Sequence, residues 1–212
     1  ETVGLVGESG SGKSTIGRAI LGMAPVSAGR IEFDGRDITH LSRRRRRALA
    51  SDIQVVFQDP YSSLSPSLTT GDTLAEPLRA RGASRAESSR RIRELLDLVH
   101  LPVDALHRMP REFSGGQRQR IAIARALALQ PRFIVCDEPV SALDLTTQAR
   151  VLDLFIEVQE RTGVAYLFIS HDLDVVRVMS HRIAVMYRGE IVERGDGDQV
   201  STNPQHPYTR RL

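Results

Sequence analysis

The sequence has one cysteine, no tryptophan and no long apolar run. The single cysteine, Cys136, excludes a disulfide framework and favours a reducing compartment. No apolar stretch approaches the ~18 residues that a membrane-spanning helix needs. Hydrophobic residues still make up 41% of the 212 residues, which is enough for a folded core and excludes a disordered tail. The chain is therefore expected to form one domain, or one domain with a sub-domain.

Lysine is also nearly absent, because Lys13 is the only one in the chain. Arginine occupies every other permanently cationic position, including the run Arg43 to Arg47. An ammonium is a more compact charge than a guanidinium, so position 13 is predicted to need that compact charge. The arginine run is consistent with a patch for phosphates or lipid headgroups, or with a solvated helix face; the solvated face is favoured.

Apolar runs alternate with helical patterns along most of the chain. Strands are predicted at residues 2–6, 30–35, 53–57, 133–136 and 164–169, with a hairpin at 183–187 and 190–193. Helices are predicted at residues 13–23, 84–100, 116–129 and 145–161. Residues 59–72 are expected to form a loop, since they are rich in Ser, Pro, Thr and Gly. This order predicts an α/β fold with a mainly parallel sheet.

The middle of the chain carries no strand signal, which suggests how the domain is organised. Residues 1–58 and 129–195 are expected to form a core with a small antiparallel β part, and residues 59–128 an inserted helical sub-domain. Residues 196–212 are expected to be a polar C-terminal extension. The first residues are expected to be a strand that has lost its beginning.

One glycine-rich segment matches the pattern G-x-x-x-x-G-K-[ST] and lies between a predicted strand and a predicted helix. Its backbone N–H groups and the helix N-terminus favour bound phosphates. Lys13 can reach the β- and γ-phosphates of a nucleotide, and the Ser14 hydroxyl can bind Mg²⁺. A chance glycine turn is a poor alternative in this setting. The expected phosphate-binding residues are Gly7, Glu8, Ser9, Gly10, Ser11, Gly12, Lys13, Ser14 and Thr15.

Two acidic residues follow the apolar strand at 133–136. Open α/β sheets place ligand groups at the carboxyl ends of their strands, so Asp137 is expected to hold Mg²⁺, through water. Glu138 is expected to act as the general base on an attacking water. Acidic residues also end strands for solubility, but the glycine-rich motif makes that the weaker interpretation. Cys136 is interpreted as a small buried residue without a redox role.

A second helix start carries Ser114, Gly115, Gly116 and Gln117. A serine and two glycines at a helix N-terminus can bind an anion. Alone, this pattern usually indicates a helix-capping loop. Its position about twenty residues before Asp137 favours a second phosphate-binding element, which would serve the nucleotide of another molecule.

Together these motifs resemble the nucleotide-binding domain of ATP-binding cassette (ABC) proteins, over essentially the whole chain. The resemblance rests on the glycine-rich motif, Gln58, the segment 114–117, the pair Asp137-Glu138 with the loop 141–144, and His171. Phe113 stands where the family more often has leucine. The family's adenine-stacking aromatic residue lies upstream of the first strand, so the chain is expected to be part of a longer protein.

The resemblance implies a P-loop NTPase (RecA-like) core and further site residues. Gln58 would contact Mg²⁺ and the γ-phosphate and couple to the membrane partner. The residues 114–117 would contact ATP held by an opposite protomer, and Asp144 would contact across that interface. His171 would stabilise the γ-phosphate and the geometry of Glu138. The implied cofactors are ATP and Mg²⁺, and the implied catalytic residues are Lys13, Gln58, Glu138 and His171.

A narrower resemblance connects the segments 57–66 (FQDPYSSLSP), 137–144 (DEPVSALD) and 203–209 (NPQHPYT) to oligopeptide, dipeptide and nickel importer ATPases. It implies a peripheral protein on the cytoplasmic face of the cell membrane. Its partners would be a second ABC ATPase domain, arranged head to tail, and two transmembrane permease subunits, with an extracytoplasmic solute-binding protein delivering solute. The loop 59–68 would lie near the permease docking groove.

Two other functions are compatible with the ATP motifs. A non-transport cassette in DNA repair, chromosome maintenance or translation shares them, but often carries long coiled-coil, zinc-binding or linker insertions, which this sequence lacks. A binding module without turnover is disfavoured by the intact Glu138 and His171. The transport ATPase is therefore preferred, and no nucleic acid is expected as a partner.

Overall fold

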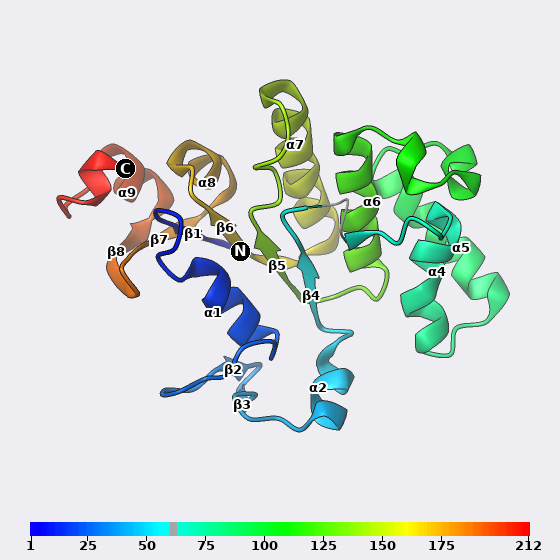
Figure 1. Cartoon of the computed structure of the whole chain (residues 1–212), viewed down its shortest axis with the longest axis horizontal. Coiled ribbons are helices and arrows are strands. Elements are labelled where there is room, and N and C mark those ends of the chain that lie inside the picture. Colours follow the sequence, from blue (N-terminus) through cyan, green and yellow to red (C-terminus); the bar gives the residue numbers. More distant parts are fainter. Residues whose placement is uncertain (60–62) are drawn as a thin grey trace. The chain divides into compact units, whose positions relative to one another are not determined.

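The structure, a computed structural model, describes residues 1–59 and 63–212 and contains two compact units (Figure 1). The core unit comprises Glu1–Val55, Phe133–Asp137 and Ala165–Leu212. The helical unit comprises Val56–Arg132 and Glu138–Val164. The expected docking loop at 59–68 includes residues 60–62, which lie outside the described residues.

The core unit is built on a mainly parallel sheet. In sheet order the strands are β4 (Ile53–Val56), β5 (Phe133–Asp137), β6 (Ala165–Ser170), β1 (Thr2–Val6), β7 (Arg182–Tyr187) and β8 (Glu190–Asp196). The β5–β6, β6–β1 and β1–β7 pairs are parallel, and β8 runs antiparallel to β7. A separate antiparallel pair joins β2 (Glu32–Phe33) to β3 (Arg36–Asp37). The predicted fold class and the predicted hairpin are confirmed.

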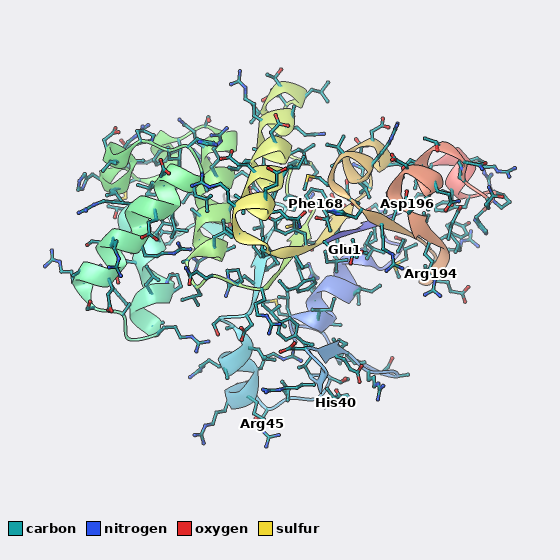
Figure 2. All side chains as sticks on the ribbon, turned by 180° about the vertical axis from the view of Figure 1, so that it is seen from behind. Glu1, His40, Arg45, Phe168, Arg194 and Asp196 are labelled. Carbon is teal, nitrogen blue, oxygen red and sulfur yellow. The ribbon has the colours of Figure 1, made fainter. Side chains whose placement is uncertain are left out.

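Helices pack on both faces of this sheet. The core unit includes α1 (Lys13–Ile20), α2 (Arg43–Leu49), α8 (Leu173–Met179), α9 (Gly197–Thr202) and the 3₁₀ turn η3 (Thr209–Arg211). Leu5 packs in a cluster with Ile16 and Ile20 of α1, whereas Val6 packs with Val176 of α8. Successive residues of a strand face opposite sides of a sheet, so α1 and α8 cover opposite faces. Side chains fill the space between the sheet and the helices on each face. The buried Phe168 belongs to the sheet itself (Figure 2).

The arginine run forms α2, and one of its members differs from the others. Arg45 is exposed (Figure 2), as are Arg43, Arg44 and Arg47. Arg46 is half-buried, and its guanidinium donates hydrogen bonds to the carbonyl oxygens of Ile20 and Ile38. The solvated-face prediction therefore fails at Arg46, which ties α2 to the end of α1.

The helical unit consists mainly of helices packed on one another. These are α4 (Thr70–Ala80), α5 (Arg85–Leu98), η1 (Val103–His107), η2 (Pro110–Glu112), α6 (Gly115–Leu127) and α7 (Leu145–Thr162). Helix α4 packs on α5 and α6, and α6 packs on α7. The predicted capping box at Ser84 and Glu87 is present. The loop predicted to reach residue 72 ends earlier, because the Thr69 hydroxyl caps α4.

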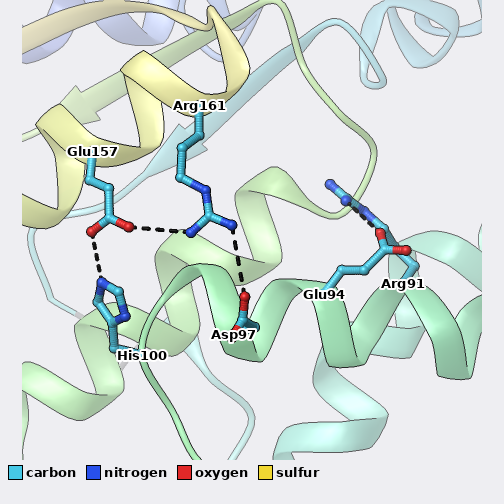
Figure 3. A network of polar contacts seen from close by, with 6 residues as sticks. All are labelled: Arg91, Glu94, Asp97, His100, Glu157 and Arg161. Atoms are coloured by element: carbon cyan, nitrogen blue, oxygen red, sulfur yellow. Dashed lines mark hydrogen bonds and ion pairs between the residues drawn. The ribbon is translucent and has the colours of Figure 1, made fainter.

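Charged side chains connect α5, and His100 just beyond its end, to α7 (Figure 3). Arg161 pairs with Glu157 at 3.2 Å and with Asp97 at 3.8 Å. The ring Nε2 of His100 lies 2.7 Å from the same Glu157 carboxylate. Exposed pairs of this kind stabilise a fold by at most ~1 kcal/mol each.

The segment 196–212, expected to be a polar C-terminal extension, folds onto the core unit. Asp196 caps α9 through its carboxylate. Tyr208 is 6% exposed and packs in one cluster with Val6, Ile183 and Val200. The polar composition of this segment gave no sign that it packs on the core, because only one aromatic ring, that of Tyr208, anchors it. Among the described residues, no helix is both long and apolar enough to cross a membrane.

Candidate nucleotide-binding site

The glycine-rich loop joins the end of β1 to the start of α1, as its motif predicts. Gly12 caps the helix with a φ of 108°, a conformation that side chains disfavour. Gly7 lies against the β7–β8 hairpin, because a Cβ there would lie 2.1 Å from the Met186 carbonyl oxygen. The Gly189 N–H donates to the Ser11 carbonyl at 3.0 Å. The loop is therefore supported by the hairpin.

Lys13 is the first residue of α1 and is 4% exposed. Its Nζ lies 2.7 Å from the carbonyl oxygen of Gly7 and 2.9 Å from that of Glu8. The ammonium is thus held against the backbone of the glycine-rich loop itself. The Ser11 hydroxyl is buried there too and has no hydrogen-bond partner among the described residues. A buried polar atom without a partner is consistent with a loop built to receive a polar ligand.

The next residue, Ser14, is brought to the acidic strand end. Its hydroxyl donates to Oδ1 of Asp137 at 2.8 Å, although 123 positions separate the two residues. Hydroxyl and carboxylate oxygens suit Mg²⁺, which usually keeps water and substrate phosphates among its ligands. No group of three or more His, Cys, Asp or Glu residues able to hold a metal occurs in the described ranges. The donors here therefore fit an ion carried largely by nucleotide and water.

His171 follows β6 at the same edge of the sheet. In the sheet, Ile169 lies beside Asp137, the last residue of β5, and Ser170 lies beside Val6, the last residue of β1. His171 is the next residue after Ser170, so it follows directly after the ends of these two strands. It is exposed. Cys136 is a free cysteine, and its predicted burial is confirmed. Burial, and secondly the Asp137 charge, raise the pKa of the Cys136 thiol well above its usual value, so this thiol stays neutral.

The predicted second phosphate-binding element lies in the helical unit. Ser114 is the N-cap of α6 and forms a capping box with Gln117: the Gln117 N–H donates to Ser114 Oγ at 3.4 Å, and Gln117 Oε1 accepts from the Ser114 N–H at 3.0 Å. Ser114 is exposed, so the start of the helix is accessible. At Gly116 a Cβ would lie 2.3 Å from the methyl group of Thr147, so the starts of α6 and α7 lie close together.

The loop before α6 is fixed from within the same unit. Phe113 is 4% exposed, and the Arg108 guanidinium lies 4.4 Å from the centre of its ring. Arg118 is also buried and donates from Nε to the Pro110 carbonyl oxygen at 2.6 Å. The aromatic residue at position 113 is thus buried, with the Arg108 guanidinium over its ring.

The other predicted residues of this unit occupy turns and helix starts. Gln58 is exposed just after β4. Glu138 has a φ of 50°, which is unusual outside glycine. The carbonyl oxygen of Glu138 accepts hydrogen bonds from Ser141, from its N–H at 3.3 Å and from its hydroxyl at 3.1 Å. Asp144 caps α7. Hydrogen bonds from the side chain and the N–H of Thr147 lower the pKa of Asp144.

Sequence reasoning missed one residue that touches the glycine-rich loop. The hydroxyl of Tyr208 accepts a hydrogen bond from the Glu8 N–H at 2.8 Å. The only signal was the segment 203–209, which carried a family resemblance but no local chemistry. The candidate site in the core unit thus comprises the glycine-rich loop, Lys13, Ser14, Asp137 and Tyr208, with His171 at the same edge of the sheet.

Comparisons with known proteins agree with this geometry. A family model described as "ABC transporter" matches residues 1–141. The oligopeptide transport ATP-binding protein OppD of Mycobacterium tuberculosis is 54% identical over the whole chain, which spans 34% of that protein. A putative peptide import ATP-binding protein of Brucella ovis is 52% identical over the whole chain, which spans 67% of that protein.

A solved structure shows the same fold. It is a dimer of the ATP-binding cassette MJ0796 in a post-hydrolysis state with bound ADP and Pi. The TM-score is 0.81 at 34% identity, covering 92% of this chain and 85% of the other. The similarity therefore extends through both units of the chain.

Proposed function

Because the chain belongs to the ABC transporter family, we propose that it is the ATP-hydrolysing part of an importer for peptides or similar small solutes. The relatives named for oligopeptide transport and peptide import support the solute class. The observation that carries the ATPase proposal is the buried Lys13 beside the hydrogen-bonded pair Ser14 and Asp137. A fixed cation and a hard-oxygen pair are the groups that phosphoryl transfer requires.

Each residue has a role that follows from its chemistry. Lys13 attracts the β- and γ-phosphates, and the loop N–H groups and the start of α1 add partial positive charge. Ser14 and Asp137, with Gln58, would hold Mg²⁺, which neutralises charge on the phosphates. Glu138 accepts the proton of the attacking water, which makes that water a better nucleophile. His171 donates a hydrogen bond toward the γ-phosphate.

We propose that two such domains associate head to tail. The exposed start of α6 at Ser114 offers N–H groups and a helix dipole to a phosphate. The core unit already has a phosphate-binding site in its own glycine-rich loop. The start of α6 is therefore available for the nucleotide of a second domain. The second domain would bring its own glycine-rich loop to Ser114–Gln117, and Asp144 would contact across the interface. The dimeric structure of the similar cassette supports the association of two domains.

The remaining partners are proposed from the importer assignment. Two permease subunits would hold the domain at the cytoplasmic face of the membrane. ATP binding would close the dimer and hydrolysis would open it. The permeases would follow these movements and change the side of the membrane from which the solute path is accessible. An extracytoplasmic solute-binding protein would deliver the solute.

The experiment that tests this function starts from the complete native protein. It is purified from its own membranes in mild detergent, and the co-purifying proteins are identified by mass spectrometry. Two multi-spanning permeases and a second cassette domain, in the same chain or another, are the expected result. Nucleic acid, repair factors or ribosomes in their place would overturn the transport assignment and leave the ATP chemistry intact.

A further inference from the structure

The C-terminal segment, residues 203–212, is fixed to the sheet of the core unit. Glu193 of β8 accepts hydrogen bonds from the N–H groups of Gln205 at 2.8 Å and His206 at 3.0 Å. The His206 Nδ1 accepts from the Tyr208 N–H at 3.2 Å. The segment therefore approaches the sheet in a defined conformation and presents the Tyr208 ring to it.

The ring of Tyr208 is held on several sides. It is buried in the cluster that contains Val6, the last residue before the glycine-rich loop. Its centroid lies 4.3 Å from that of the Tyr187 ring, near the end of β7. A tyrosine has few rotatable bonds, so a buried ring fixes the position of its hydroxyl. That hydroxyl is 2.8 Å from the Glu8 nitrogen.

Glu8 is thereby held at both polar groups of its backbone. Its N–H donates to Tyr208, and its carbonyl oxygen accepts from Lys13 at 2.9 Å. A glycine-rich loop has more backbone freedom than other segments, so an external contact at its start restricts the conformations it samples. Tyr208 lies 200 positions away in sequence and supplies that contact.

We propose that Tyr208 is a positioning residue for the nucleotide: through its hydroxyl, the C-terminal segment holds the start of the glycine-rich loop in the conformation that receives the phosphates. The apparent dissociation constant of a ligand rises as the competent fraction of the protein falls. One net hydrogen bond is worth about 1 kcal/mol, so losing it lowers the equilibrium constant for the competent conformation about fivefold, and lowers the competent fraction and the affinity for ATP by up to about fivefold.

The test compares Tyr208→Phe with Tyr187→Phe in the full-length protein. Both variants keep their rings and lose one hydroxyl, and the Tyr187 hydroxyl makes no hydrogen bond to any described residue. Dissociation constants for MgATP are measured by equilibrium dialysis, and KM and kcat by phosphate release. We expect Tyr208→Phe to raise Kd and KM together, by up to about fivefold, with kcat within about twofold, and Tyr187→Phe to match the wild type.

Hydrogen exchange of the peptide containing Glu8, without nucleotide, reports the contact directly. Faster exchange in Tyr208→Phe alone supports the proposal. An unchanged Kd, an equal change in both variants, or unaltered exchange would overturn it. The proposal rests on ATP binding at the loop and not on import, so a missing permease partner would leave this test valid.

Discussion

Replacing Lys13 by alanine separates the contribution of its ammonium to folding from its contribution to nucleotide binding. Without nucleotide, Nζ contacts two carbonyl oxygens at 2.7 and 2.9 Å, and the residue is 4% exposed. Hydrogen bonds to a charged group favour folding by about 1.5–3 kcal/mol each, whereas burying the ammonium costs several kcal/mol. These terms oppose each other. We therefore expect the nucleotide-free variant to differ in free energy of unfolding by at most about 2 kcal/mol.

The effect on nucleotide binding is not offset in this way. MgATP at 100 times its dissociation constant stabilises the wild type by about 2.7 kcal/mol, which raises the melting temperature by roughly 5–11 °C. Loss of the charge that faces the phosphates is expected to weaken binding by at least about 100-fold. The same MgATP concentration then stabilises the variant by only about 0.4 kcal/mol, or roughly 1–2 °C.

Thermal melts with and without MgATP measure both quantities on one sample. Arg18→Ala is the matched control, because it removes one positive charge from the exposed side of the same helix. This control should keep the full shift with MgATP. A shift of wild-type size in Lys13→Ala would refute the assignment of the glycine-rich loop as the phosphate site. Loss of the shift in both variants would mean that net charge, and not Lys13, governs binding.

Three further predictions concern catalysis, anchoring and pH. Glu138→Gln should bind MgATP but hydrolyse it at least about 100-fold more slowly, because an amide cannot accept the water proton; normal turnover in a phosphate-release assay would exclude Glu138 as the base. Arg46→Ala should lower the free energy of unfolding in urea by about 1–3 kcal/mol, whereas Arg45→Ala should change it by no more than about 0.5 kcal/mol; equal losses would contradict the anchoring role. The hydrogen bond with His100 holds the pKa of Glu157 below its ordinary value of 4.5, so the stability it adds is present above pH 4.5 and is lost as the pH falls through the folded value. The stability difference between wild type and Glu157→Gln should therefore shrink in acid, and a difference that stays constant down to about pH 3 would count against this pair.

Most of the fold was predictable because its signals are local. The strand before the glycine-rich loop is a short apolar run, and the loop itself needs glycines where the backbone leaves the usual conformations. The meeting of Ser14 with Asp137 followed from a topological rule, since parallel strands present their carboxyl ends at one edge. The capping box at Ser84 was likewise contained in four consecutive residues.

The failure at the arginine run has a different cause, namely hydrogen-bond partners outside the run. Composition described the arginine run correctly on average, but one guanidinium reaches the carbonyl oxygens of Ile20 and Ile38. The loop predicted at 59–72 ends early for a local reason, because the Thr69 hydroxyl accepts a hydrogen bond from the Asp72 N–H three residues on and so caps α4. Neither contact changes the hydrophobic periodicity of its own segment, so periodicity could not reveal it.

Tyr208 shows why such contacts matter for function. The segment around it is rich in polar residues and proline, so its average composition predicts exposure. A single aromatic ring can nevertheless anchor a polar segment, because its buried area outweighs the small cost of ordering its few rotatable bonds. The ring that anchors the segment also carries the hydroxyl that contacts Glu8. Packing and nucleotide positioning are therefore properties of one residue, and only the hydroxyl-deleting variant separates them.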